Sequence, residues 1–351
     1  MRDLALKVVQ PAIDAGIDVV DSLSSNVCVP YACELVGVAL AVNNTTTDIH
    51  TFDVMINDVE TTIDLVVPDT FDKGIVYTDA KCILQQAERI GLKSNGETAT
   101  ASTDATIAFI FKPLSSRPVG EVWLHGQEMS DIASATSSQT KCVPFSSKLV
   151  GYAGSFEAAT DALVHIDIMV DNADSGVDVN VPLGSTGGLF TPEASVEVKA
   201  GGSLHSRSNG EGTSGGANSV TWVLQPDGPT HPAGWDYLPF SGGIDIGGAN
   251  NFVDVVSPSS GRVRNLMVHA TSPVTVATNF ALRVNGVAPA GAPNYVLAVD
   301  ALDEGGQSMP IGNMHYTYVE EGDLIDVLSG GETDPASNSV GGIWIEPMGG
   351  G

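Results

Sequence analysis

Basic residues are scarce in this sequence of 351 residues. Lysine and arginine together number 15, against 42 aspartates and glutamates, so the formal net charge at pH 7 is -27. Binding to a nucleic acid backbone needs basic side chains that displace counterions, and anionic membrane surfaces attract the same side chains. The composition therefore argues against nucleic acid and membrane surfaces as partners and favours a protein that faces solvent.

Long apolar runs and cysteines are also few. No stretch of about 18 apolar residues could span a membrane, and the first residues lack the apolar centre of a secretory signal. The four cysteines, Cys28, Cys33, Cys82 and Cys142, are too few and too unevenly spaced for a disulfide scaffold. No histidine close in sequence completes a zinc site with the first two. We expect four buried, reduced cysteines.

A repeat of about 114 residues organises what is present. Similar segments recur at this offset, since Phe52, Ile166 and Phe280 are each 114 positions apart: Thr51–Asn57, His165–Asp171 and Asn279–Asn285. Each copy ends in an apolar run closed by proline: Phe109–Pro113, Trp222–Pro226 and Ile343–Pro347. Solenoid repeats are roughly 20–50 residues long, so this period is the length of a whole domain.

Within each copy, short alternating segments are separated by turns rich in glycine, asparagine, aspartate and proline. This pattern predicts an all-β chain of three tandem antiparallel β-sandwiches of the jelly-roll type. The expected domains are residues 1–113, 114–227 and 228–351. Linkers are expected near Leu114–Gly120 and Asp227–Gly234, both rich in proline, serine or glycine.

Local predictions follow from comparing the copies. Ala80–Ile90 is rich in helix formers, but its counterparts Ala194–Leu204 and Met314–Leu324 alternate, so we expect strand, turn and strand in all three. A hairpin turn is expected at Asp174–Gly176. The first twenty residues are expected to form a short helix or an extended arm, without an equally apolar counterpart before the second and third copies.

Three aspartates form the best candidate for a metal site. Asp171, Asp174 and Asp178 lie in one acidic turn and carry hard oxygen ligands suited to calcium. The first copy has Asn57, Glu60 and Asp64 in these places, and the third has lost the set. The spacing is not that of an EF-hand, and turns rich in aspartate and asparagine also form for purely local reasons, so calcium and a solvated turn both remain open.

No catalytic set emerges from the sequence. Gly212–Gly216 matches G-x-S-x-G, but a nucleophile elbow needs a strand before it and a helix after it. The seven histidines form no metal-binding pair, and no phosphate-binding or dinucleotide fingerprint appears. We therefore expect no enzyme and no cofactor. Trp222 is expected in a core, whereas Trp123, Trp235 and Tyr237 are expected to pack between domains or to offer a surface for glycans.

Two short stretches resemble a known group of proteins. Met1–Ile13 resembles the start of small structural proteins encoded among the head genes of tailed bacteriophages. Val319–Val327 looks like the glycine–aspartate step of jelly-roll modules in virion decoration, cement and fibre proteins. The resemblance implies a virion protein that binds the major capsid protein, and it implies no particular functional residues.

The expected function is therefore non-enzymatic decoration or cementing of the outer surface of a phage capsid, after synthesis in the host cytoplasm. The alternatives are a tail or fibre adhesin that binds host glycans, and a β-sandwich enzyme that acts on polysaccharides. The three domains could form a pseudo-threefold cluster within one chain or a linear stalk, and three chains could form a trimer. We expect the segment from Met1 to about Ser25, with the first domain, to contact the partner.

Overall fold

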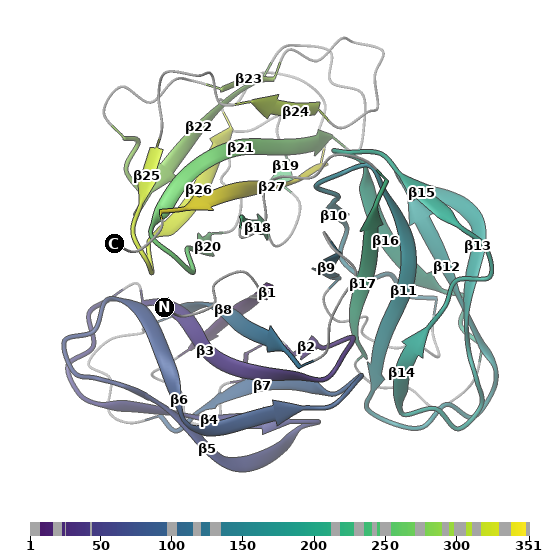
Figure 1. Ribbon diagram of the computed structural model, residues 1–351, viewed down its shortest axis with the longest axis horizontal. Coiled ribbons are helices and arrows are strands. Elements are labelled where there is room, and N and C mark those ends of the chain that lie inside the picture. The colour runs from purple at the N-terminus through teal and green to yellow at the C-terminus, as the bar shows by residue number, and fades with distance from the viewer. Residues whose placement is uncertain are drawn as a thin grey trace.

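The computed structural model describes residues 8–16, 23–24, 26–42, 44–96, 104–114, 121–126, 135–211, 218–227, 235–240, 244–245, 254–270, 278–289, 295–297, 307–310, 317–329 and 338–348. These residues form antiparallel sheets that build three β-sandwiches, arranged around a common centre when the molecule is viewed down its shortest axis (Figure 1). In this part of the chain no helix is long and apolar enough to cross a membrane. The all-β prediction with three tandem sandwiches is confirmed.

The first sandwich contains eight strands that form one continuous hydrogen-bonded path, β1-β8-β3-β6-β5-β4-β7-β2. They are β1 (Val8–Gly16), β2 (Val27–Cys28), β3 (Cys33–Val42), β4 (His50–Ile56), β5 (Val59–Val67), β6 (Lys73–Leu84), β7 (Arg89–Ser94) and β8 (Asp104–Pro113). The long strand β6 pairs with β3 in one layer and with β5 in the other, so it joins the two sheets.

The second sandwich has sheets β14-β11-β17-β9 and β10-β16-β12-β13, and β15 also pairs with β11. Its strands are β9 (Val122–His125), β10 (Lys141–Cys142), β11 (Ser147–Phe156), β12 (Val164–Val170), β13 (Ala173–Val181), β14 (Gly187–Phe190), β15 (Val196–Val198), β16 (Ser203–Ser208) and β17 (Asn218–Pro226).

The third sandwich repeats this plan, with sheets β18-β27-β21-β24 and β20-β26-β22-β23. Two more strands pair outside these paths, β19 with β27 and β25 with β21. The strands are β18 (Asp236–Pro239), β19 (Ile244–Asp245), β20 (Val255–Val256), β21 (Gly261–Ala270), β22 (Thr278–Val284), β23 (Tyr295–Leu297), β24 (Gln307–Pro310), β25 (Thr317–Val319), β26 (Leu324–Ser329) and β27 (Asn338–Pro347).

Strand register is the same in all three copies. The central pairs β3–β8, β11–β17 and β21–β27 each carry a shift of one residue, and these irregularities begin at Leu35, Leu149 and Val263. A bulge of this kind bends a strand and increases its twist, and it is usually retained for that reason. Its presence at equivalent places shows that the repeat seen in the sequence extends to backbone detail.

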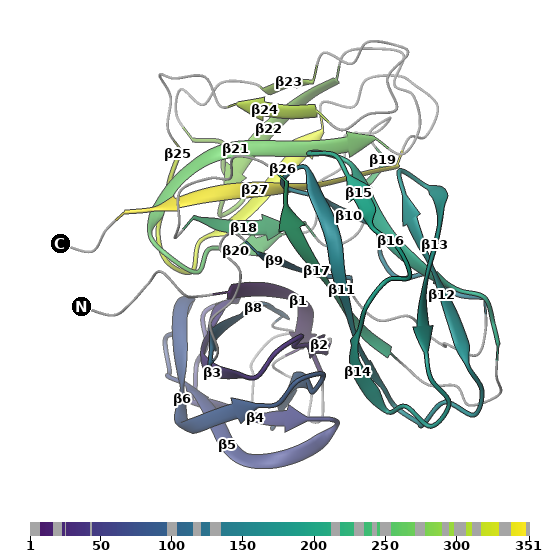
Figure 2. The ribbon, with the colours of Figure 1, turned by 45° about the vertical axis from the view of Figure 1, so that its right-hand side comes forward.

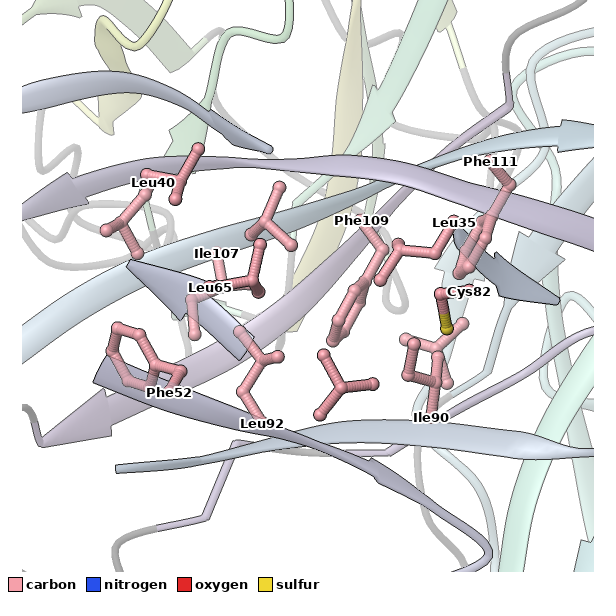
Figure 3. Close-up of a cluster of buried hydrophobic side chains, with 14 of the residues drawn as sticks. Leu35, Leu40, Phe52, Leu65, Cys82, Ile90, Leu92, Ile107, Phe109 and Phe111 are labelled. Atoms are coloured by element: carbon pink, nitrogen blue, oxygen red, sulfur yellow. The ribbon is translucent and has the colours of Figure 1, made fainter. Parts of the chain in front are cut away.

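Each sandwich encloses a core of alternating inward-facing side chains. In the first, Leu35, Leu40, Phe52, Phe109 and Phe111 are almost completely buried between the two sheets (Figure 3). The second core contains Trp222 with no exposed surface, as the sequence predicts. The four cysteines are buried and free, and burial raises the pKa of the Cys82 thiol to about 11, which keeps it protonated.

The predicted position of the hairpin turn, Asp174–Gly176, is wrong, because the turn begins three residues earlier. The turn between β12 and β13 is Asp171–Asn172, whose φ angles are 50° and 61°. Two-residue hairpin loops favour positive φ at both positions, because that twist matches the twist of the strands. Gly176 lies instead within β13, in the register shift where Asp167 pairs with Asp178 and Met169 pairs with Asp174.

The N-terminal segment is neither a helix nor a free arm where it is described. Residues 8–16 form β1, which pairs with β8 at the edge of the first sandwich. Pro11 is accommodated because an edge strand needs hydrogen bonds on only one side. The segment has structural counterparts that the sequence analysis did not identify, since β9 and β18 occupy the same edge position. Trp123 and Tyr237 lie 114 and 228 residues after Val9.

The strand–turn–strand prediction for Ala80–Ile90 and its counterparts is confirmed by β6 and β7, by β15 and β16, and by β25 and β26. The proposed linkers lie mostly outside the described residues.

Candidate functional site

The three aspartates considered as calcium ligands are directed to different partners. Asp171 Oδ1 accepts the backbone N–H of Ser203 at 2.8 Å. Asp174 Oδ1 accepts the N–H of Gly176 at 2.8 Å, while its Oδ2 lies 3.7 Å from Arg207. Asp178 lies in β13 opposite Asp167. Among the residues that the structure describes, no three His, Cys, Asp or Glu side chains gather closely enough to hold a metal ion.

The other two copies explain why position 171 carries an aspartate or an asparagine. Asn57 Oδ1 accepts the N–H of Arg89 at 3.1 Å, and Asn285 Oδ1 accepts the N–H of Leu324 at 2.9 Å. Both asparagines also begin two-residue turns and have positive φ. An asparagine or aspartate tolerates this conformation and supplies the oxygen that ties the turn to the neighbouring strand. The position therefore has a structural task that is common to all three sandwiches.

Carboxylates face one another on the outer sheets of the first two sandwiches. Asp64 lies opposite Asp53, and Asp178 lies opposite Asp167. Partial burial and the facing aspartate raise the pKa of both Asp64 and Asp178. In the second sandwich Arg207 donates to Asp167 at 2.6 Å. In the first, Lys93 donates at 2.7 Å to Glu60, a charged neighbour of Asp64.

Other candidates from the sequence do not come together. Gly212–Gly216, His231 and His315 lie outside the described residues. His165 bonds to Glu211 near the surface, and its pKa is raised by that bond. His125 is buried and its Nδ1 lies 2.9 Å from the Val220 carbonyl. Burial, with a smaller effect from a nearby lysine, lowers the pKa of His125 to about 3, so this ring is neutral.

The three seams between the sandwiches are the feature with the most distinctive chemistry. In each seam a short edge strand of one sandwich contacts the central strand pair of the next: β2 against β11 and β17, β10 against β21 and β27, and β20 against β3 and β8 (Figure 2). The contacts are head to tail and cyclic, because the third sandwich returns to the first. That last seam joins the third sandwich to the first. These two sandwiches are not consecutive in the chain, so no linker connects them directly across the seam.

Apolar packing crosses every seam in the same direction. Trp123 and Val223 of the second sandwich enter the core cluster of the first, and Met267 and Trp344 of the third enter that of the second. Four residues of the first enter the cluster of the third: Ala39, Ala41, Ala108 and Ile110. The strand registers place Ile110, Val223 and Trp344 at equivalent positions. The molecule is therefore a closed ring with approximate threefold symmetry.

Equivalent seams use different side chains to make the same polar contact. The carbonyl of Cys28 accepts the hydroxyl of Thr221 at 2.7 Å, and the equivalent carbonyl of Cys142 accepts the hydroxyl of Tyr237 at 2.8 Å. Gly342 occupies the place of Thr221 in the third sandwich, and a Cβ there would lie 2.4 Å from the Tyr237 hydroxyl oxygen. The tyrosine thus fills the space that the missing side chain leaves.

A lysine lies in the second seam at an otherwise apolar position. Lys141 is 4% exposed, and its Nζ lies 3.3 Å from both Gln139 Oε1 and the Phe240 carbonyl oxygen. Burial lowers the pKa of Lys141 to about 7. Val27 and Val255 are its counterparts in the other seams. The repeat alignment holds a usable signal, a charged residue where two copies have valine, but sequence reasoning missed it.

The aromatic residues considered for glycan binding pack within the ring. Trp123 is 4% exposed and its ring centroid is 5.9 Å from that of Tyr31, while its Nε1 donates to Glu121 at 2.9 Å. The ring of Tyr237 lies 5.0 Å from that of Trp344. The guanidinium of Arg264 lies 5.8 Å from the ring centre of Trp235. The sequence allowed these residues either to pack between domains or to form a glycan surface. The structure places Trp123 and Tyr237 between sandwiches.

No family model and no curated protein matches this sequence. Among solved structures, similarity was found to a chain from a structure of the triple jelly roll fold and turret assembly in an archaeal virus, at 10% identity and a TM-score of 0.22, covering 97% of this chain and 89% of that one. A chain from the atomic structure of Sulfolobus turreted icosahedral virus matches at 10% identity and a TM-score of 0.22, covering 97% and 90%. A third match, PNGF-II, has 10% identity and a TM-score of 0.23, covering 63% and 65%. At these TM-scores the similarities carry no argument about function.

Proposed function

We propose that this protein is a non-enzymatic structural component of a virion, which binds the major capsid protein and decorates or cements the outer surface of the shell. The observation that carries the proposal is the closed ring of three quasi-equivalent sandwiches, joined through apolar seams. Such a ring presents similar features three times around one axis, so one chain suits a threefold or quasi-threefold position on a symmetric shell.

Charge supports an outer location. A chain with a net charge of -27 is repelled by packaged nucleic acid and remains soluble at the surface. A shell surface with basic residues is the complementary partner, and attraction of this kind weakens with added salt.

The N-terminal segment has a different part in this proposal from the one that the sequence suggested. Residues 8–16 are paired with β8, and β1 also contacts β9 and β18 at the centre of the ring. They are therefore engaged within the chain, and the outer sheets of the sandwiches are the better candidates for contact with the shell.

Cryo-electron microscopy of the particle that carries this protein tests the proposal directly. We expect density for a three-lobed ring on the outside of the shell, bridging neighbouring capsid subunits. Density confined to the tail would contradict it. So would a sedimentation experiment at low salt in which tail-less capsids, mixed with the protein, sediment without it.

A further inference from the structure

The seam between the third and first sandwiches contains an ion pair whose geometry can be compared with the other seams. Lys73, the first residue of β6, donates to Asp323, which is 4% exposed. The amide of Asn285 donates to the same carboxylate oxygen at 2.8 Å. A lysine of one sandwich is thus held by a carboxylate of the neighbouring sandwich, and a turn asparagine donates to that carboxylate.

The first seam keeps the carboxylate. Glu88 occupies the place of Asp323, since both residues follow the turn between equivalent strands. Glu88 Oε2 accepts the N–H of Gln85 at 2.7 Å, and Asp323 Oδ2 accepts the N–H of Glu320 at 2.6 Å. Asn57 is likewise the equivalent of Asn285.

The first seam lacks the lysine. Lys73 lies opposite Ala41 in the pairing of β3 with β6, and Gly187 lies opposite Ser155 in the equivalent pairing of β11 with β14. A Cβ on Gly187 would come within 2.9 Å of the Gly154 carbonyl oxygen. The second sandwich therefore cannot supply a lysine from this position.

A cavity of about 360 Å³ lies where that lysine would be. Its walls include Asn57, Glu88, Arg89, Ser155, Glu157 and Gly187. This volume is within the range of roughly 300–1,000 Å³ that is usual for ligand sites. Arg89 bonds to Asp58, whose charge offsets its own, so the two glutamates leave the site net negative.

We propose that this cavity binds a primary alkylammonium group, the chemistry of a lysine side chain, supplied from outside the chain. The bound ammonium occupies the place that Lys73 occupies in the third–first seam, with Glu88 as its acceptor. The site depends only on the geometry of the seam, not on the virion role, so each can fail without the other.

The probe is n-butylammonium chloride, added to the full chain and followed by calorimetric titration and by amide chemical shifts in NMR. We expect one saturable site, with shifts centred on Glu88 and Gly187. Glu88→Gln should weaken binding by at least about tenfold, because the ammonium then meets a neutral amide in place of a carboxylate. Neutral n-butanol, which has the same carbon chain, should not bind there.

Lys73→Ala is the matched control, because it opens the equivalent position beside Asp323. We expect this variant to bind a second equivalent of butylammonium and to regain part of its lost thermal stability on binding. If the variant binds the probe beside Asp323 while the cavity beside Glu88 binds none, the proposal is wrong. Wild-type and Glu88→Gln titrations decide the matter if Lys73→Ala does not fold.

Two further probes separate the sources of the ammonium group. N-acetyl-lysine-N-methylamide represents a lysine on a partner protein, and putrescine represents a free diamine. Binding of the lysine derivative at least as tight as that of butylammonium supports a partner lysine. Binding of putrescine alone would overturn that source and assign the site to free polyamines.

Discussion

The second residue of each two-residue hairpin turn must adopt a positive φ angle, and the three copies use three different residues there. Asp58, Asn172 and Gly286 occupy this position, with φ angles of 62°, 61° and 74°. Only the third copy uses glycine, the residue for which this conformation costs least. The Asn285–Gly286 pair is of the type that favours a two-residue hairpin turn most strongly.

Gly286 therefore gives a clear test of backbone strain. A Cβ on Gly286 would meet no atom within 4 Å, so any cost of a side chain comes from the positive φ alone. We expect Gly286→Ala to lower the free energy of unfolding by about 1 kcal/mol, measured by urea denaturation. Gly286→Asn, which copies the second sandwich, should cost clearly less, and equal costs for both variants would contradict this explanation.

Lys141 should make stability depend on pH in a defined direction. In the unfolded chain a lysine keeps its proton up to about pH 10.4, whereas in the folded chain burial lowers the pKa to about 7. Between these values the unfolded state binds more protons, so this group's contribution to stability rises with pH. Its destabilising effect is complete below pH 7 and disappears above the unfolded pKa.

We therefore expect Lys141→Val, which installs the residue of the other two seams, to raise the free energy of unfolding by a few kcal/mol at pH 6. The gain should shrink by about 1.4 kcal/mol per pH unit above pH 7. Denaturant unfolding from pH 6 to 10 measures it, with Lys81→Val at an exposed position as the control. A gain that does not change with pH would contradict the buried-amine explanation.

Part of this residue-level detail was predictable from the sequence and part was not. The expected turn at Asp174–Gly176 gave weight to a glycine, but the third copy has its Asn–Gly pair at the position of Asp171–Asn172. Aligning all three turns would have corrected the position. The separation of the three aspartates could not be predicted, because it depends on which strand faces each carboxylate.

At the scale of elements, the central strands of each sandwich have two apolar faces. The strand β3 is buried along nearly its whole length, because Leu35, Val38 and Leu40 face its own core while Ala39 and Ala41 face the third sandwich. A continuous apolar run of this kind indicates burial on both sides. The sequence therefore held evidence for packing between sandwiches, although it did not show which sandwich covers which face.

Trp344 tests how strongly such a second face contributes. Its ring centroid lies 4.9 Å from that of Phe145 in the second sandwich, and the residue is 3% exposed. We expect Trp344→Ala to lower the free energy of unfolding by roughly 3–5 kcal/mol. Tyr318→Ala, at a position that is 56% exposed, should cost less than about 1 kcal/mol. Similar losses for the two variants in chemical denaturation would show that the seam contributes little.

At the scale of the whole molecule, the sequence left open a stalk, a cluster within one chain and a trimer of chains. Local patterns could not decide among them, because all three arrangements use the same sandwiches and differ only in which faces meet. The structure shows the cluster within one chain, and every seam face of the repeat is used once.

A closed ring leaves no seam face unpaired, so the chain should be a monomer in solution. Light scattering coupled to size-exclusion chromatography should give a mass near 36.3 kDa. A mass three times larger at micromolar concentration would show that other surfaces drive assembly and would contradict the ring as the complete unit.

The seam between the third and first sandwiches is held by contacts alone, including the pair of Lys73 with Asp323. The same contacts could in principle form between two chains, so closure competes with polymerisation. Within one chain the two faces meet at an effective concentration of the order of millimolar, as for short flexible linkers. Closed rings therefore dominate in dilute solution. At concentrations near that value, or after thermal opening and slow cooling, the same protein has the means to form open chains of swapped sandwiches, a ring–chain equilibrium governed by concentration.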